Sequence, residues 1–297
     1  MRRNTRVRGL VLVGNDISMI DVLLATYHPQ TEMLKAQVES ICSQRGVKVN
    51  LICRKDTNGL GASSNFSALL AESNAEYISF SDQDDVWKED KLCKCLIRMH
   101  EIEAAYGRNV PLLVFCDGYV TDADLNPKPG TVMSRQGIDA EKGLCFNRLL
   151  MQNFVPGNAM LFNAALREKA GRVPVQALMH DAWLILVAAA FGRISFLNEP
   201  LYFYRQHKQN LIGATKSDWR YIARRVCEGH LAFRNRLLCN IYQAQAFVRR
   251  FGEESPDSAS VLAKFPFIGW AERRVALVRH GLWKHGLFRN LALLAFS

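Results

Sequence analysis

The sequence lacks several features that would each indicate a particular class of protein. No stretch approaches the roughly 18 apolar residues needed to span a bilayer, and the apolar run near the start, about five residues long, is too short for a signal peptide. The eight cysteines contain no CxxC pair and no regular spacing, which argues against a disulfide framework and a zinc site. We therefore expect reduced thiols in a cytosolic protein.

Motifs for nucleic acid and low-complexity sequence are also missing. The chain has no Gly-rich phosphate loop, no nucleic-acid-binding module and no internal repeat. Its hydrophobic fraction of 49% and charged fraction of 22% are those of an ordinary globular protein, so disorder is excluded. A chain of 297 residues suits one large domain with an appendage.

The charge is present but unevenly placed. The formal net charge is +10, and residues 216–297 hold 14 basic and 6 acidic residues, so the first 215 residues are nearly neutral. Such asymmetry indicates an appended region that meets an anionic surface. Because Trp283, Phe288 and several leucines are interleaved with the cations, we expect interfacial helices at a membrane. A solvated helix face is the alternative.

Hydrophobic patterning over the first two thirds predicts alternating strands and helices. Short apolar runs predict buried strands, and apolar residues at helical spacing separate them. This alternation predicts an α/β fold with a mainly parallel sheet, whose ligands bind at the carboxyl ends of the strands. We expect strands at 21–26, 47–53, 76–81, 112–116 and 193–197, helices near 31–42, 63–73 and 92–103, a loop at 126–137, and helical stretches from 218 onward and at 272–296.

One strand end carries three acids in the run SDQDDVW, Ser81 to Trp87. Asp82, Asp84 and Asp85 could hold Mg²⁺ or Mn²⁺, which take one or two protein carboxylates together with substrate phosphates. Alternatively, Asp84 or Asp85 could cap the following helix. A cap needs only one acid, and three close carboxylates repel each other without a cation.

Two further positions have a chemical and a structural interpretation. Asp181 begins a predicted helix, where it could act as a general base or as a cap. His207 could be a ligand or an ordinary packed histidine. Trp183 is by default a core residue.

In this order, six stretches resemble the family 2 glycosyltransferases, and within them the rhamnosyltransferase-like branch that builds cell-surface polysaccharides. The resemblance covers residues 20–214 and lies in DVLLATYHPQ, LGASSNFSALL, AEYISFSDQDDVW, VPGNAMLF, MHDAWL and LYFYRQHKQNLIGA. It implies a GT-A (Rossmann-like) fold, a nucleotide-sugar donor and Mn²⁺ or Mg²⁺. Residues 1–19 would then be an N-terminal extension, and residues 215–297 a basic helical region.

The resemblance also implies roles for individual residues. Asp181 would be the catalytic base, and Asp84 the direct metal ligand. Thr26 and Tyr27 would contact the nucleobase, and Asp56 would contact the base or ribose. Asp82 would hold the ribose or metal-bound water, and His207 would lie near the metal and diphosphate. The sugar and acceptor loop would contain Gly157, Asn158, His180 and Trp183.

The sequence departs from the family pattern after Asp56. The family usually has about one αβ unit there, roughly 25 residues, whereas here Gly59-Leu60-Gly61 follows almost directly. His28, Lys55 and Ala182 also replace residues that are usual in the family.

The resemblance implies an inverting, metal-dependent hexosyltransferase. It would move rhamnose or another deoxyhexose from a dTDP- or UDP-linked donor to a cell-surface polysaccharide or lipid-linked acceptor. We expect peripheral attachment to the inner face of the cell membrane and no nucleic-acid partner. Because of the missing unit, the alternative is a non-catalytic nucleotide-sugar-binding or scaffold protein. A metal-dependent phosphohydrolase is disfavoured, since a His-rich or two-metal constellation is absent.

Overall fold

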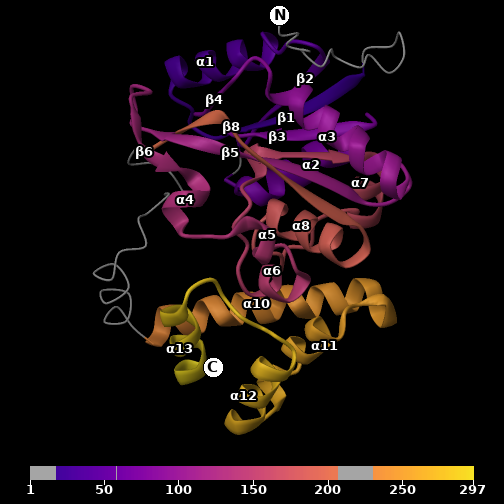
Figure 1. Cartoon of the computed structure of the whole chain (residues 1–297), viewed down its shortest axis with the longest axis vertical. Coiled ribbons are helices and arrows are strands. Elements are labelled where there is room, and N and C mark those ends of the chain that lie inside the picture. Colours follow the sequence, from indigo (N-terminus) through magenta and orange to yellow (C-terminus); the bar gives the residue numbers. More distant parts are fainter. Residues whose placement is uncertain (1–17, 58, 207–229) are drawn as a thin grey trace, which may run out of the picture.

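The computed structural model describes residues 18–57, 59–206 and 230–297 (Figure 1). His207 and the helix expected from residue 218 to 229 lie outside these ranges, and so does most of the expected N-terminal extension. In the described residues, one sheet with flanking helices occupies one end of the molecule, and the helices that follow residue 230 lie together at the other end (Figure 1).

The first half of the sheet is parallel. β1 (Met19–Thr26) pairs in parallel with β2 (Lys48–Lys55) and with β3 (Tyr77–Ser81), in the order β2-β1-β3. α1 (Thr31–Cys42) and α2 (Ala62–Glu72) are the crossovers. The apolar run in β1 is fully buried, as expected for a central strand. Only residues 56–61 join β2 to α2, so β2 is the end strand of this half.

The second half of the sheet is mixed. β7 (Met160–Asn163) is antiparallel to β3 and to β5 (Leu112–Thr121), and β5 is parallel to β8 (Arg193–Arg205). The short strands β4 (Val86–Trp87) and β6 (Pro127–Thr131) pair antiparallel with β8 and β5.

The expected α/β fold, with flanking helices and with helices after the sheet, is thereby confirmed. Most of the paired residues belong to the parallel pairs β1–β2, β1–β3 and β5–β8. The short strand β7 departs from this pattern, because it runs antiparallel to both of its neighbours, β3 and β5.

Short helices fill the chain between the later strands. α3 (Lys91–Tyr106) leads to β5, and the expected loop at 126–137 contains β6 and α4. Thr131 caps α4 by accepting from the N–H of Ser134 at 3.3 Å, and Gly137 ends it at φ 63°. The other elements are α4 (Val132–Gln136), α5 (Ala140–Gly143), α6 (Phe146–Met151), η1 (Gly157–Ala159), α7 (Ala164–Ala170) and α8 (His180–Phe191).

The C-terminal helices are built around α10 (His230–Phe251), which packs against α6 and, through its rings, against α8. The helical stretch expected at 272–296 is two helices, because Gly281 and Gly286 adopt positive φ values of 59° and 91° between them. The described helices include none that is both long and apolar enough to cross a bilayer. The remaining elements are η2 (Gly252–Glu254), α11 (Asp257–Ala263), η3 (Phe265–Phe267), α12 (Trp270–Arg279) and α13 (Leu287–Phe296).

Candidate active site

The candidate site lies where β1 and β3 end. Leu24 of β1 is in register with Ser81 of β3, so the residues that follow the two parallel strands emerge at the same edge of the sheet. Thr26 and Tyr27 come from β1, and the Asp82–Asp85 loop follows β3. The structure therefore brings together the two segments that the sequence placed at strand ends.

Gln83 ties these two segments together. Its side-chain oxygen accepts from the N–H of Tyr27 at 2.8 Å, and its side-chain amide donates to the Tyr27 carbonyl oxygen at 3.1 Å. The Tyr27 ring stays 54% exposed and contacts the ring of His28 edge-on at 4.4 Å. His28 has φ 42°, a conformation that non-glycine residues rarely adopt. An exposed aromatic ring is thus held beside the carboxylates.

Asp85 is a buried hub between three segments. Its carboxylate is fully buried and accepts from the backbone N–H of Arg205 at 3.2 Å and from the side-chain amide of Asn158. The interpretation of Asp85 as a helix cap is wrong, because the residue at the N-cap of α3 is Asp90. Asp85 instead fixes the end of β8 and the 157–159 turn against the acidic loop.

Lys91 places a cation beneath this hub. Its ammonium is 1% exposed, donates to the carbonyl oxygen of Asn158 at 2.7 Å and lies 3.2 Å from the centre of the Trp87 ring. Burial lowers the pKa of Lys91 to about 8, against the opposing influence of several neighbours that include Asp85 and Asp82. Buried charges persist only with such partners. Lys91 binds the backbone carbonyl of Asn158 and Asp85 binds its side-chain amide, so the two residues hold Asn158 from two sides.

Negative charge converges at the mouth of the site. Burial, together with the nearby charges of Asp84 and Asp181, raises the pKa of Asp82 to about 7. Carboxylates in this arrangement are stabilised by a proton or a cation.

The donor chemistry of Asp82 and Asp84 fits Mn²⁺ or Mg²⁺, which bind one or two carboxylates together with phosphate oxygens. Among the residues that the structure describes, no three His, Cys, Asp or Glu side chains gather as a complete metal site. Asp82 and Asp84 would therefore be the protein's share of a site that substrate phosphates complete.

Asp181 lies in the first turn of α8 and faces the same region. One carboxylate oxygen accepts from the N–H of Ala182 at 2.6 Å. Burial raises the pKa of Asp181 to about 6, while hydrogen bonds from the backbone N–H groups of Ala182 and Gly157 favour the charged form. Near pH 7 the group is mostly ionised and its pKa is close to the working pH, as a general base requires.

His180 is a neutral, enclosed ring next to Asp181. It is 4% exposed, stacks on Phe66 at 4.0 Å and meets Phe80 edge-on at 4.7 Å. Burial lowers the pKa of His180 to about 3, and neither ring nitrogen has a hydrogen-bond partner among the described residues. A Cβ at Gly157 would lie 3.0 Å from the Nε2 of His180, so the close approach of the turn favours glycine.

Two predicted site residues, Asp56 and Trp183, have polar groups that hydrogen bond within the protein. The carboxylate of Asp56 accepts from the N–H groups of Leu60 at 3.1 Å and Gly61 at 2.9 Å, which closes the short connection into α2. Trp183 is fully buried; its indole N–H donates to the carbonyl oxygen of Ala170 at 3.2 Å. The structure does not bring Trp183 to the site surface.

Sequence reasoning missed Gln83 and Lys91. Gln83 lies inside the acidic motif, where attention to the charges hid an amide that can pair with a backbone. Lys91 has no sequence signal at all, because an ordinary lysine in the first turn of a charged helix is expected to face water.

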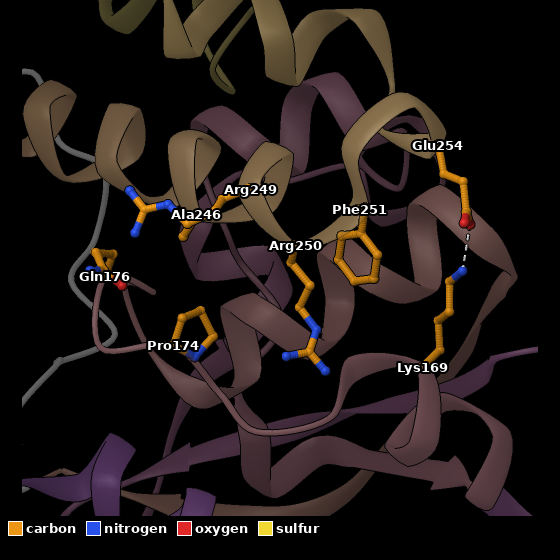
Figure 2. Close-up of a pocket in the computed structure, with 8 residues that line it drawn as sticks. All are labelled: Lys169, Pro174, Gln176, Ala246, Arg249, Arg250, Phe251 and Glu254. Carbon is orange, nitrogen blue, oxygen red and sulfur yellow. Dashed lines mark hydrogen bonds and ion pairs between the residues drawn. The ribbon is translucent and has the colours of Figure 1, made fainter.

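A separate cavity opens between α10 and the loop after α7. Its volume is about 650 Å³, and the ion pair between Lys169 and Glu254, at 2.6 Å, closes one side (Figure 2). Arg249 and Arg250 point toward it from α10. None of the predicted site residues that the structure describes lines this cavity, so it is not the acidic site.

The chain is similar to a family model and to several known proteins. Residues 30–168 match the family model "Glycosyl transferase family 2". Uncharacterized proteins of Mycobacterium bovis and Mycobacterium tuberculosis are 24% identical over 170 residues, which is 56% of this chain. The match spans 44% of the length of those relatives.

Two solved structures share the outline at low identity. S. aureus TarS 1–349 in complex with UDP-GlcNAc is 12% identical, with a TM-score of 0.46 over 87% of this chain and 78% of that one. The mannosyltransferase PcManGT from Pyrobaculum calidifontis, in complex with GDP-Man and Mn²⁺, is 15% identical, with a TM-score of 0.47 over 95% and 79%. By the family match, residues 30–168 of this chain are similar to glycosyl transferase family 2.

Proposed function

We propose that the protein is an inverting, metal-dependent glycosyltransferase. The observation that carries the proposal is that the charges of Asp82, Asp84 and Asp181 lie close together. Asp82 and Asp84 fall within the residues that match the family 2 model, and Asp181 follows them in the sequence. A carboxylate with a pKa near 6 and two further carboxylates that can ligate a divalent cation suit transfer from a nucleotide-sugar donor.

The donor would lie across the ends of β1 and β3. Thr26 and the exposed Tyr27 ring would hold the nucleobase, with Asp56 nearby, and Asp82 and Asp84 would hold Mn²⁺ or Mg²⁺ and the diphosphate. His207 is proposed as a further ligand from the chain after β8. A bound divalent cation would offset the negative charge that grows on the leaving nucleoside diphosphate.

Asp181 would remove the proton of the acceptor hydroxyl as that oxygen attacks the anomeric carbon. The Gly157–Asn158 turn and His180 would bound the sugar and acceptor side, and Trp183 would act only by fixing the helix that carries Asp181. By resemblance we propose rhamnose or another deoxyhexose, carried on dTDP or UDP. The proposed acceptor is a cell-surface polysaccharide or lipid-linked glycan.

We further propose that the work is done at the inner face of the cell membrane. In this proposal residues 20–214 form the catalytic domain, residues 215–297 form the basic helical region, and residues 1–19 precede them.

A specific observation supports a second candidate. Residues 56–61 replace a whole αβ unit of the family pattern, and the carboxylate of Asp56 is occupied by backbone N–H groups. A protein with this shortened nucleotide half could bind a nucleotide sugar, or act as a scaffold, without turning it over.

Turnover of dTDP- and UDP-sugars with Mn²⁺ or Mg²⁺ tests both candidates. We expect Asp181→Asn to lower kcat by about 100-fold or more, as loss of a general base does. We expect Asp84→Ala to abolish the activity, and added Mn²⁺ or Mg²⁺ should not restore it. Equal turnover in the three proteins would sink the mechanism. Tight metal-dependent nucleotide binding by calorimetry, without any turnover, would favour the non-catalytic candidate.

A further inference from the structure

η3, α12 and α13 expose large apolar side chains. Phe267 is 81% exposed, Trp270 65%, Leu287 70% and Phe288 60%. α12 and α13 lie at the end of the molecule away from α1 and β2, beyond α10 (Figure 1). Contiguous exposed apolar surface of this kind indicates a binding surface.

On α12 the exposed apolar residues follow one face. Ala271, Val275 and Val278 recur at helical spacing and are all exposed, whereas Leu277 on the other side is fully buried. Residues spaced by three and four lie on the same face of a helix. Trp270 and Phe267 are further exposed apolar residues at and before the N-terminus of α12, and the guanidinium of Arg274 lies 3.4 Å from the centre of the Trp270 ring.

α13 repeats the pattern. Leu287, Phe288 and Leu291 are exposed, and Leu293 is fully buried on the opposite side. Arg274 joins the two helices, because its guanidinium donates to the carbonyl oxygens of Ala295 at 3.2 Å and Ser297 at 3.3 Å. The two apolar faces therefore lie on neighbouring helices that are tied to each other.

Cations surround these faces. Residues 264–297 hold six basic side chains and one acidic side chain, Glu272. Lys264 and Arg279 are exposed, and Arg273, Arg274 and Arg289 are partly exposed. Narrow apolar faces bordered by Lys and Arg, with aromatic rings at their ends, are typical of helices that lie in a membrane interface. The cores of protein–protein interfaces are instead depleted in charge.

We infer that η3, α12 and α13 form a docking surface for an anionic lipid bilayer. Phe267, Trp270, Leu287, Phe288 and Leu291 enter the boundary between headgroups and acyl chains, and the surrounding cations contact anionic headgroups. This inference rests on the proposed membrane location but not on the transfer chemistry, so the two can fail separately.

Flotation with lipid vesicles tests the surface on the full chain. Wild type should bind vesicles containing roughly 30% phosphatidylglycerol in phosphatidylcholine at low salt and bind less at about 0.5 M salt, where charges are screened. Replacing Leu287, Phe288 and Leu291 together by serine should weaken binding about tenfold or more, because binding scales with buried apolar area.

A matched control removes apolar surface elsewhere. Ile97→Ser with Tyr106→Ser changes two half-exposed residues of α3 (48% and 49% exposed) and should leave vesicle binding within about twofold of wild type. Lys264→Gln with Arg279→Gln should weaken binding to anionic vesicles and leave the weak binding to pure phosphatidylcholine unchanged. Thermal melting checks that each variant is folded.

Three results would overturn the inference. These are no binding of wild type to anionic vesicles at low salt, equal binding by the serine variant, or a wild-type dimer that the serine variant converts to monomer, which would assign the surface to a second copy. Transfer to a water-soluble acceptor should survive in the serine variant. If transfer is absent but vesicle binding persists, only the proposed function fails.

Discussion

The acidic site and the C-terminal helices place their charge in opposite ways. At the site, burial shifts the pKa values of Asp82, Asp85 and Lys91. Asp85 and Lys91 are also fixed by hydrogen bonds to backbone groups. On η3, α12 and α13, cations remain at the surface around exposed apolar side chains. Buried charge gives a rigid, selective site, whereas surface charge gives a broad attraction that salt screens.

The largest expected effect concerns the packing of α8, which carries Asp181, against α10 of the C-terminal helices. Trp183 is fully buried and its ring lies 5.5 Å from Phe247 and 6.0 Å from Phe251 of α10. Trp183→Ala should lower the free energy of unfolding by about 3–5 kcal/mol through lost burial and the cavity. Urea denaturation measures it. Trp270→Ala, at an exposed tryptophan, should stay within about 0.5 kcal/mol.

The next effect tests the buried hub. Asp85→Ala leaves the amide of Asn158 and the N–H of Arg205 without their shared acceptor. The cost should be about 2–4 kcal/mol, because unpaired buried polar groups lose their solvation. Asp85→Asn keeps one acceptor oxygen and should lose less. Equal losses in both variants, by urea denaturation, would show that the charge and not the hydrogen bonds matters.

A smaller effect is pH-dependent and isolates Asp82. Its pKa is raised to about 7 in the folded protein and is about 4 in an unfolded chain. The folded state therefore holds the proton more tightly, and this carboxyl costs stability as the pH rises from about 4 through 7.

Asp82→Asn should accordingly gain stability over wild type across that pH window, by on the order of 2 kcal/mol at pH 8. Mn²⁺ should reverse the difference, since it binds the ionised carboxylate and displaces the proton. Thermal unfolding at several pH values, with chelator or with Mn²⁺, measures both. A difference that does not change with pH would contradict the convergence of charge at Asp82.

The smallest effect concerns the tie between the two halves of the site. Gln83→Ala removes both hydrogen bonds to Tyr27 without disturbing the core, so the free energy of unfolding should change by about 0.5 kcal/mol or less. Nucleotide affinity should fall roughly tenfold, because the Tyr27 ring is no longer oriented. Calorimetry with nucleoside diphosphate measures it. Unchanged affinity would mean that Gln83 serves only the loop itself.

Periodicity predicted the strands and helices of the first half because their side chains face one consistent environment. The first part of β8 (Arg193–Arg205) was also predicted, as a strand at 193–197. The antiparallel direction of β7 could not be predicted, since β7 is only four residues long and its partners are far away in the sequence. Pattern reasoning reports what a segment buries and not which strand it meets.

The site was partly predictable for a similar reason. A strand end with three acids identified the loop at 82–85, and an acid at a helix start identified Asp181; the structure places them near one another. The roles of Asp85 and Lys91 depend on partners 73 and 67 residues away, and no local pattern contains them. The contacts of Trp183 are also beyond a local pattern, since its ring packs against residues of α10.

The position of β7 has a consequence for how the chain folds as it is synthesised. β1, β2 and β3 are consecutive and can pair once residue 81 has emerged, but β7 lies between β3 and β5 and appears about 80 residues later. Until then β3 has an unpaired edge, and β5 must wait until residue 193 for its parallel neighbour β8. Such long-range pairings fold slowly. During that interval β3 and β5, which are almost entirely buried in the folded protein, are the segments most exposed to misassociation.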